Sequence, residues 1–593
     1  MDEPRNACGT RSFRASHPEH MVRLGRDRSP ARLALYLDAL RGMRRRQIVG
    51  RLRRLIPPSV LAAGTRVRRL PKPRLLAAGL GHSPAPQSGP TQPPHETGVF
   101  AGYGTSREFA DPRFWDDPRD GLLFLLHLHG FSPLAEYAAA TGSPAGDAFW
   151  ARVVDSWLTA HDHPSSPAWH PYPTSVRVIS WSAALSAIEG WPAELRSRLA
   201  AAILRQARYL RRAVEHDVGG NHVLKNAAAL VFAGGLFPDS GLMGGGLRLL
   251  RRELALQLLP DGGHEERSTS YQREIVSDLA DVQELLRRSG ETLPDWLGES
   301  LERMRRWLDT VSGPDGRLPL LNDAWDGPPV GAGETEGITN VHETGYVVFK
   351  HGLDQLLFDA GPLCPPHLPP HAHADALSFV LWADGRPLVI DPGSYAYSGD
   401  ARDRFRSTAA HNTVEVDATD QCEFWGDFRA AHLPDVAPAR VVRHDELLLA
   451  TSRHDGYRRL SEPVEHERTM VWWPEWGVVI LDRLVGRGFH GIRSRLHCAP
   501  DATPVGPHRL GPFELTVLGG PAPELREGLY SPFLGASLPA PVIELRFTVG
   551  VGRVFGWSLL RPGARVVEVS DEGLVVEGSG KLLRAPSFPT EGP

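Results

Sequence analysis

Two histidines stand two residues apart in the segment His371-Ala-His373-Ala-Asp375-Ala-Leu-Ser-Phe. In an extended segment, side chains two residues apart point to the same side. A neutral imidazole nitrogen can ligate a metal or accept a proton, so the pair predicts a metal site or a general base. Two further candidates follow at strand or turn positions, Asp391 in Ile-Asp-Pro-Gly and His411 in Ala-His-Asn-Thr. These groups do chemistry together only if the fold brings them together.

Two kinds of element must position these residues. From about residue 108 to 325, apolar residues recur at helical spacing, and loops rich in Gly, His and Pro separate the runs. Many antiparallel helices joined by such loops predict a solenoid or toroid of helical hairpins. After about residue 340, short β-rich runs are separated by Gly, Pro and Asp. That series predicts an antiparallel β-sandwich, and a ligand site is expected in the cleft between the two domains.

The N-terminal region has a different amino-acid composition and pattern. Residues 1–31 are expected to be disordered, and residues 33–61 have a basic, amphipathic helical pattern. The pattern favours a helix packed on the next domain over a membrane anchor. Residues 82–95 are a Pro-rich linker. The predicted organisation is therefore an N-terminal region over 1–97, a helical toroid over 98–335 and a β-sandwich over 336–593, an α+β multidomain chain.

Composition limits the function. The chain has 593 residues, a formal net charge of −4, and 41% hydrophobic and 23% charged residues, which is typical of a soluble multidomain protein. This balance gives no support for nucleic acid as a partner. The four cysteines are far apart, so neither a disulfide framework nor a cysteine zinc site is expected. No apolar run predicts a signal peptide or a transmembrane span, so a cytoplasmic location is expected unless the start is misassigned.

Five motifs in order resemble the heparinase II/III family of polysaccharide lyases. They begin with Asn221-His222, continue with Asp261-Gly-Gly-His through Tyr271 and with the His371 segment, and end with Asp391-Pro-Gly and with Phe405 through His411-Asn-Thr. The resemblance runs from roughly Leu35 through the β domain. It implies an (α/α) toroid followed by an antiparallel β-sandwich, which agrees with the helical spacing and the later β-rich runs of the sequence.

The resemblance also implies a reaction, β-elimination on a uronic acid in a glycan. The C5 proton is removed and the C4 oxygen leaves, so the enzyme must stabilise the substrate carboxylate and supply a base and an acid. By resemblance the catalytic set is Asn221, His222, Tyr271 and His371. Asn221 suits the carboxylate, Tyr271 could act as base, acid or both, and one of the histidines could act on an epimeric uronate. The expected substrate-binding residues are Tyr172, Arg177, Glu266, Arg406 and Trp425.

The resemblance implies a metal as well. His373, Asp391 and His411 match the zinc-binding positions of members that carry a metal, and mixed nitrogen and oxygen ligands suit Zn²⁺. The metal is expected to hold the loop that carries His371. The strict alternation of a strand would put His371 and His373 on one face, so a catalytic His371 and a ligating His373 predict a shaped loop. The expected partner is an acidic glycan or oligosaccharide, and a homodimer is left open.

Each assignment has a purely structural alternative. Asn221 suits a helix N-cap, and Asp391-Pro-Gly suits a turn. The histidines, tyrosine and tryptophan could be core residues, and the two arginines could form internal ion pairs. The chain also departs from the family pattern, with Lys225 where Glu is common and Gln272 where His is common. At the level of function, a silent glycan-binding or exopolysaccharide-assembly protein and a metal-dependent hydrolase are the alternatives to a lyase.

Overall fold

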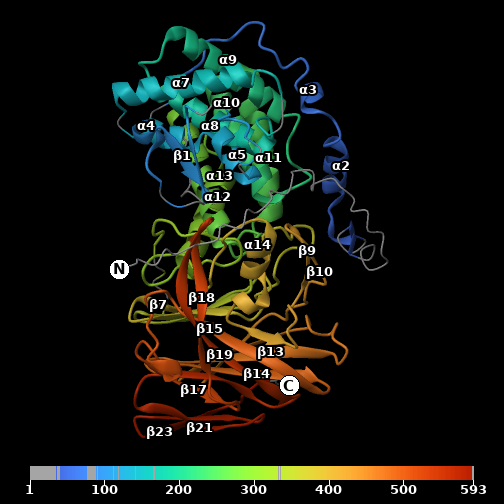
Figure 1. The fold of residues 1–593 in the computed structure, drawn as a ribbon, viewed down its shortest axis with the longest axis vertical. Helices are drawn as coiled ribbons and strands as arrows, with labels where there is room; N and C mark the ends of the chain where they lie inside the picture. Colours follow the sequence, from blue (N-terminus) through green and yellow to red (C-terminus); the bar gives the residue numbers. More distant parts are fainter. Residues whose placement is uncertain are drawn as a thin grey trace, which may run out of the picture.

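The computed structural model describes residues 35–36, 40–76, 89, 91–110, 113–117, 119, 121–140, 142–164, 167–331, 333 and 336–589. The predicted disordered start, Leu33 and most of the predicted Pro-rich linker lie outside these residues. Figure 1 shows two halves stacked along the long axis, helices in one and strands in the other. None of the described helices combines the length and the apolar run that a bilayer crossing needs.

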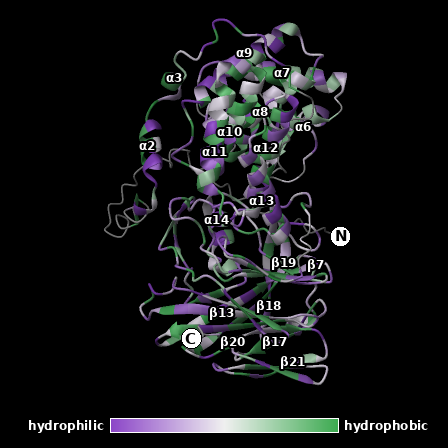
Figure 2. Cartoon of the chain, turned by 180° about the vertical axis from the view of Figure 1, so that it is seen from behind, coloured by the Kyte–Doolittle hydropathy of each residue, from purple (hydrophilic) through white to green (hydrophobic). Residues whose placement is uncertain are grey.

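The helical half is organised around α10, Gly220–Leu236, which is buried along almost its whole length. A helix that is apolar on all sides belongs in an interior, and α10 packs against α8, α9, α11 and α12. Figure 2 shows the apolar residues gathered around α8 and α10. The elements are α4 Pro94–Thr97, β1 Val99–Gly102, β2 Thr105–Glu108, α5 Leu122–Gly130, α6 Ser132–Ala139, α7 Pro144–Ala160, α8 Pro171–Ala187, α9 Ala193–Leu210, η2 Pro238–Ser240, α11 Leu242–Gln257, α12 Thr269–Arg288 and α13 Asp295–Val311.

The second half consists of antiparallel sheets. A five-stranded sheet has the order β3-β4-β5-β6-β7, a seven-stranded sheet β11-β12-β13-β14-β20-β17-β16, and a four-stranded sheet β18-β19-β15-β8. The sheets share a buried apolar core. Strands of the first and last of these sheets are β3 Gly337–Val341, β4 Tyr346–His351, β5 Asp354–Asp359, β6 Phe379–Ala383, β7 Arg386–Val389, β8 Val414–Val416, β15 Phe489–His497, β18 Glu524–Phe533 and β19 Ala536–Gly550.

The other strands complete the sandwich and its edges. The seven-stranded sheet contains β11 Arg440–His444, β12 Leu447–His454, β13 Val464–Trp473, β14 Gly477–Gly486, β16 Arg509–Leu510, β17 Phe513–Leu518 and β20 Phe555–Leu560. Smaller sheets pair β9 Glu423–Gly426 with β10 Arg429–Ala431, and join β21 Ala564–Val569, β22 Leu574–Gly578 and β23 Lys581–Ala585. Short helical pieces are α14 Gly399–Arg406, η3 Thr408–Ala410 and η4 Gly506–His508. The predicted helical toroid followed by an antiparallel β-sandwich is confirmed.

The N-terminal helix differs from its prediction. In its described part the single helix expected over 33–61 is divided: residues 35–36 and 40–42 are helical, the helix breaks at 43–44, and α2 Arg45–Arg53 is separated from α3 Pro58–Leu61 by the Pro57-Pro58 pair. It does pack on the helical half, but through polar side chains. The apolar residues of α2, which are Ile48, Val49 and Leu52, are exposed, whereas Leu61 of α3 packs against the helical core.

Candidate functional site

The start of α12 lies where the two halves meet. Ser268 caps this helix by accepting a hydrogen bond from the Tyr271 amide at 3.2 Å. Ser268, Thr269 and Ser270 then donate through their hydroxyls to the carbonyls of Asp323, Pro319 and Trp325. Three consecutive side chains therefore fix the helix end to the segment that leads into the β half. Tyr271 is the next residue, so its ring is held at this boundary.

Tyr271 and His371 come together there. Their ring centroids are 4.3 Å apart, and the Tyr271 hydroxyl lies 2.7 Å from the hydroxyl of Tyr397. His371 lies in the loop between β5 and β6, as the sequence predicted, and only 8% of it is exposed. The structure thus brings two of the predicted catalytic residues into contact and adds Tyr397 to them.

Asp323 connects these residues to the metal candidates. One carboxylate oxygen lies 2.9 Å from His371 Nδ1, and the other lies 3.1 Å from His373 Nε2 and accepts from Ser394 Oγ at 3.1 Å. Arg402 of α14 also donates to Asp323. Burial alone would raise the pKa of Asp323, but Arg402 and the two histidines outweigh it and hold that pKa well below its usual range.

An ionised Asp323 sets the tautomer of His371. A carboxylate can only accept hydrogen bonds, so Nδ1 of His371 must carry the proton. Its Nε2 then has a free lone pair, which is the form a general base needs. Tyr271, in contrast, keeps its proton, because burial and the neighbouring Tyr397 and Asp323 raise the pKa of its phenol well above the usual value. The site therefore places an imidazole with its Nε2 turned away from Asp323 beside a protonated phenol.

A second group forms at the start of α10. The helix begins at Gly220, so Asn221 is its second residue and not its cap. The Asn221 side-chain amide and backbone N–H both donate to the Glu266 carboxylate, at distances between 2.8 and 3.1 Å. A Cβ on Gly220 would lie 1.9 Å from Glu266 Oε1, so this approach requires glycine. Glu266, predicted to contact substrate, instead orients Asn221.

His222, like His371, has a buried carboxylate at its Nδ1. Its Nδ1 lies 3.2 Å from Glu215 Oε1, and its ring lies 4.6 Å from that of Tyr172, a predicted substrate contact. Burial lowers the pKa of His222, but the Glu215 charge and hydrogen bond outweigh it and raise that pKa overall. Tyr172 of α8 also contributes to the raised pKa of Tyr271, behind burial, Tyr397 and Asp323.

The metal candidates are brought together, with one change of ligand. His373, Asp375 and His411 offer ligand atoms that all lie within 4.8 Å of one another, and all three residues are buried. His373 Nδ1, His411 Nε2 and both carboxylate oxygens of Asp375 have no hydrogen-bond partner. Asp391 lies elsewhere, 2.8 Å from His411 Nδ1. The carboxylate in this cluster is thus Asp375 and not the predicted Asp391, which contacts the other nitrogen of His411 and orients its ring; that the cluster binds zinc stays a prediction.

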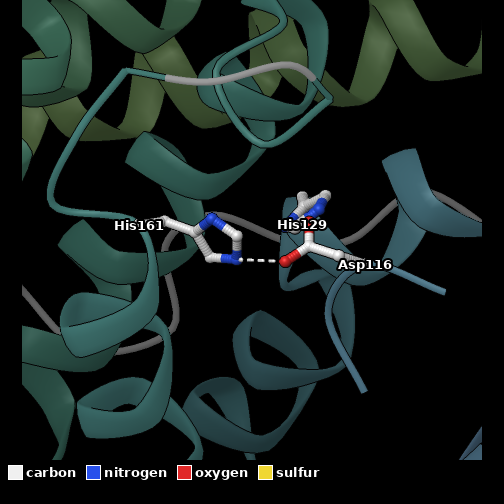
Figure 3. Close-up of side chains that lie close together, drawn as sticks. All are labelled: Asp116, His129 and His161. Carbon is white, nitrogen blue, oxygen red and sulfur yellow. Dashed lines mark ion pairs between the residues drawn. The ribbon is translucent and has the colours of Figure 1, made fainter. Parts of the chain in front are cut away.

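A second cluster of metal-type side chains lies in the helical half. Figure 3 shows Asp116, His129 and His161, with Asp116 at 3.6 Å from His161 Nε2. The Trp157 indole N–H donates to His129 Nδ1 at 3.1 Å, so the neutral His129 ring carries its proton on Nε2 and has no lone pair left for a cation. Burial lowers the pKa of His129 and His161, and the charge of the nearby Arg177 guanidinium lowers both pKa values further. We assign it to the helical core.

Two predicted substrate contacts are core residues. Arg177 is fully buried, lies 4.1 Å from the centre of the Trp157 ring, and donates to Gln206 and to the carbonyls of His129 and Ala168. Its guanidinium is thus saturated by protein groups and is not a substrate ligand.

Arg406 is corrected for the same reason. It donates to the carbonyls of Gly426 and Asp427 at 3.0 Å and to Asp403, and it lies over the Phe424 ring. Trp425 is half-buried and packs against Tyr36 and Arg429, which places it beside the N-terminal segment. The arginine that reaches the catalytic set is Arg402, one helical turn before Arg406.

The two departures from the family pattern have structural roles. Lys225 forms a buried ion pair with Asp278 at 2.7 Å. Gln272 accepts from the His264 amide and donates to the carbonyls of Gly262 and Met304, so it holds the loop before α12. Neither residue contacts the predicted catalytic residues through these bonds.

Sequence reasoning missed Asp323, Tyr397, Arg402, Glu215 and the ligand position of Asp375. Asp375 had a visible signal, because it continues the alternation of His371 and His373. Asp323 had none, since Asn322-Asp323 stands in a loop with no motif around it. Its role depends on a loop of the β half folding back onto it.

The chain is similar in sequence to known protein families. Residues 125–331 match the heparinase II/III N-terminus model, and residues 334–521 match the heparinase II/III-like C-terminal model. A heparin-sulfate lyase of Bacteroides stercoris is 26% identical over 248 residues, a stretch of 34% of this chain and only 36% of that protein. FtsZ-localized protein C of Caulobacter vibrioides is 25% identical over 406 residues, 63% of this chain and 68% of that protein.

Solved structures agree on the fold. The crystal structure of heparinase III aligns with a TM-score of 0.65 and 17% identity, covering 83% of this chain and 85% of that one. A heparan sulfate lyase mutant from Pedobacter heparinus aligns with a TM-score of 0.61 and 18% identity, covering 90% and 94%. With the two family models together matching more than half of its length, the chain belongs to the heparinase II/III family.

Proposed function

We propose that the chain is a polysaccharide lyase that cleaves a uronic-acid-containing glycan by β-elimination. The observation that carries the proposal is the Tyr271–His371 pair, a protonated phenol in ring contact with an imidazole whose Nε2 is free. Elimination needs an acid and a base on adjacent carbons of one sugar, and this pair supplies both within one site. The heparin-sulfate lyases among the relatives act on a glycan of this class by name.

Residues of this chain can supply every proton transfer that the β-elimination requires. A base takes the proton from C5, the C5–H electron pair forms the C4=C5 double bond, and the C4–O bond breaks as Tyr271 protonates the leaving oxygen. The Asn221 amide, held by Glu266, donates to the substrate carboxylate and stabilises the charge that develops there. The products are a saturated fragment with a new hydroxyl and a fragment with an unsaturated uronate.

Two imidazoles can serve as the base. His371 lies on the same side as Tyr271, since their rings are in contact. His222 comes from α10 and has its own carboxylate, Glu215. The two C5 epimers of a uronate present the C5 proton on opposite faces of the ring, so each imidazole suits one epimer.

The main test is the variant Tyr271→Phe on a panel of uronate polymers. Loss of the proton donor is expected to lower kcat by about 10²–10⁴-fold with KM much less affected. The readout is the ultraviolet absorbance of the unsaturated product. Tyr137→Phe is the matched control, because Tyr137 also hydrogen-bonds through its hydroxyl but lies away from the site. Unchanged turnover in Tyr271→Phe would remove this residue from the mechanism.

We also propose that His373, Asp375 and His411 hold a zinc ion. Four buried polar atoms without partners are costly unless a cation satisfies them, and the donor set suits Zn²⁺. The ion would order the loop that carries His371. Metal content and the thermal midpoint are the readouts: Asp375→Asn should lose the metal, whereas Asp391→Asn should weaken it about 10–100-fold. Metal retained at full occupancy in Asp375→Asn would refute the assignment.

A silent scaffold protein is the second candidate function. It is suggested by the match to FtsZ-localized protein C over 63% of this chain, a protein that is not named as a lyase, whereas the heparin-sulfate lyase of Pedobacter heparinus matches over 70%. Under this alternative the same site would bind a uronate glycan without cleaving it. Glycan binding by calorimetry with no unsaturated product on any polymer of the panel would favour the scaffold, and a saturated product would point to hydrolysis instead.

A further inference from the structure

Helix α2 faces the protein with its polar side. At 3.6 residues per turn, Gln47, Gly50 and Arg54 share one side of the helix. Gln47 donates to the carbonyl of His367 at 2.9 Å, and Arg54 pairs with Asp217 at 2.8 Å. A Cβ on Gly50 would meet the Asp217 amide nitrogen at 2.5 Å, so the backbone of α2 lies directly on that turn. Arg44 and Arg46 add ion pairs to Glu265 and Glu253.

The opposite side of the same helix is apolar and exposed. Ile48, Val49 and Leu52 lie on it, and Leu52 is 63% exposed. The row continues into the next turn and α3, where Leu55 is 71% exposed. Figure 1 shows α2 and α3 along the outside of the helical half. We call this row the outer face; its exposed apolar members are Ile48, Val49, Leu52, Leu55, Ile56 and Val60.

This orientation reverses that of an ordinary surface helix. Amphipathic helices of globular proteins bury the apolar stripe and expose the charges. Here hydrogen bonds and ion pairs anchor the helix and leave the apolar stripe outward. Isolated exposed apolar residues are normal, but a contiguous apolar row bordered by charge marks an interaction surface.

The charge around the outer face is of one sign. Between residues 40 and 76 the chain contains no Asp or Glu, although its formal net charge is −4. Arg51 and Arg53 lie on either side of the apolar row of α2, Arg45 lies at its start, and all three are exposed. The basic residues of this stretch are Arg41, Arg44, Arg45, Arg46, Arg51, Arg53, Arg54, Arg66, Arg68, Arg69, Lys72 and Arg74.

The apolar row and its basic edges together indicate which kind of partner can bind the outer face. A second copy of the chain in a twofold pairing would bring these arginines against one another, which like charges oppose. A nucleic acid would need the charges at the centre of the face, yet the centre is apolar. An anionic lipid surface fits both features, because acyl chains accept the apolar row while arginines at its edges reach the headgroups.

We propose that the outer face of α2 and α3 docks on an anionic phospholipid surface. The helices would lie in the plane of the interface, and none crosses the bilayer. Because Gln47 ties α2 to the His367 carbonyl, a few residues before His371, docking would hold the catalytic loop beside the lipid surface. The inference does not depend on which function the site performs.

Vesicle flotation of the full-length chain tests the proposal. Wild type should float with vesicles that contain phosphatidylglycerol, float much less with phosphatidylcholine alone, and be released by salt. The double variant Leu52→Gln/Leu55→Gln should weaken binding by about tenfold or more, since each leucine loses apolar burial. Arg51→Glu/Arg53→Glu should weaken it about tenfold or more, because each arginine near an anionic surface contributes about 1 kcal/mol.

The control variant changes two other exposed leucines, which lie in the β half, Leu525→Gln/Leu582→Gln, and should float as wild type does. All these side chains are exposed, so thermal melting should stay unchanged. Wild type that fails to float with anionic vesicles would overturn the proposal, as would equal flotation of the Leu52/Leu55 variant. A wild-type dimer in solution that the Leu52/Leu55 variant dissociates would overturn it in favour of a second copy.

Discussion

At the scale of single residues, His222 and His371 are chemically alike. Each has its Nδ1 within hydrogen-bond distance of a buried carboxylate, Glu215 for the first and Asp323 for the second. The surroundings hold the pKa of both carboxylates below the usual range, although burial alone would raise it. Each carboxylate therefore remains an acceptor, and each imidazole presents its Nε2. The difference between the two lies in their elements, α10 for one and the β5–β6 loop for the other.

This difference predicts epimer selectivity. His222→Gln should lower kcat on one C5 epimer by about 10²-fold or more and leave the other much less affected, because only one epimer presents its C5 proton to that side. His371→Gln should show the reverse preference. Initial rates on glucuronate- and iduronate-containing oligosaccharides measure this. Equal losses on both epimers in both variants would contradict a division of labour between the two imidazoles.

Residue types were predictable from the sequence where a motif surrounded them. The histidines, Tyr271 and Asn221 all stand in such motifs, and the structure places them in two neighbouring groups. The error over Asp391 has a physical origin. Asp391 does contact His411, but at the nitrogen on the far side of the ring from Asp375, and sequence spacing cannot tell which imidazole nitrogen a carboxylate faces. The prediction that Arg177 and Arg406 bind substrate was wrong. The sequence does not show whether a guanidinium is exposed or is buried with all its donors bonded to protein groups.

At the scale of elements, the start of α10 depends on the absence of a side chain. Gly219 and Gly220 both have positive φ, 83° and 55°, a region that glycine adopts without strain. The turn brings the backbone N–H of Asn221 onto Glu266, which also accepts from the Asn221 side-chain amide. The helix was predicted from its apolar spacing, whereas this contact could not be, because it depends on the loop before α12 folding across the helix end.

Gly220→Ala should therefore impair catalysis without unfolding the chain. Its Cβ would displace Glu266 and release Asn221, and the positive φ adds backbone strain of about 1–2 kcal/mol. We expect kcat to fall about 10-fold or more as the carboxylate contact loosens. Gly245→Ala is the control, because that glycine in α11 has nothing within 4 Å of its Cβ position. Equal activity of the two variants would show that Glu266 can move without consequence.

At the scale of the whole molecule, Glu265 joins three parts of the chain. Arg44, just before α2, donates to it at 2.8 Å, and His367 of the β half lies 3.4 Å from it, while Glu265 itself belongs to the loop before α12. His264 is its other titratable neighbour. Burial raises the pKa of Glu265, but His367, His264 and Arg44 outweigh it and lower that pKa overall. The sequence predicted the two halves and their order, but contacts such as this one join residues hundreds of positions apart and follow no local pattern.

The lowered pKa gives a stability prediction with a definite sign. A carboxyl whose folded-state pKa is depressed stabilises the fold above its unfolded-state pKa of about 4.3, and this contribution is lost as the pH falls through the folded-state pKa. Glu265→Gln should thus lower the free energy of unfolding by about 1–3 kcal/mol at neutral pH, the range for hydrogen bonds to charged groups. Below pH 4 the difference from wild type should shrink, because wild-type Glu265 then becomes protonated and neutral as well. Thermal melts of both proteins across this pH range measure the difference, and Glu291→Gln, on the loop after α12, serves as the control. A constant difference at all pH values would show that Glu265 acts through its shape and not through its charge.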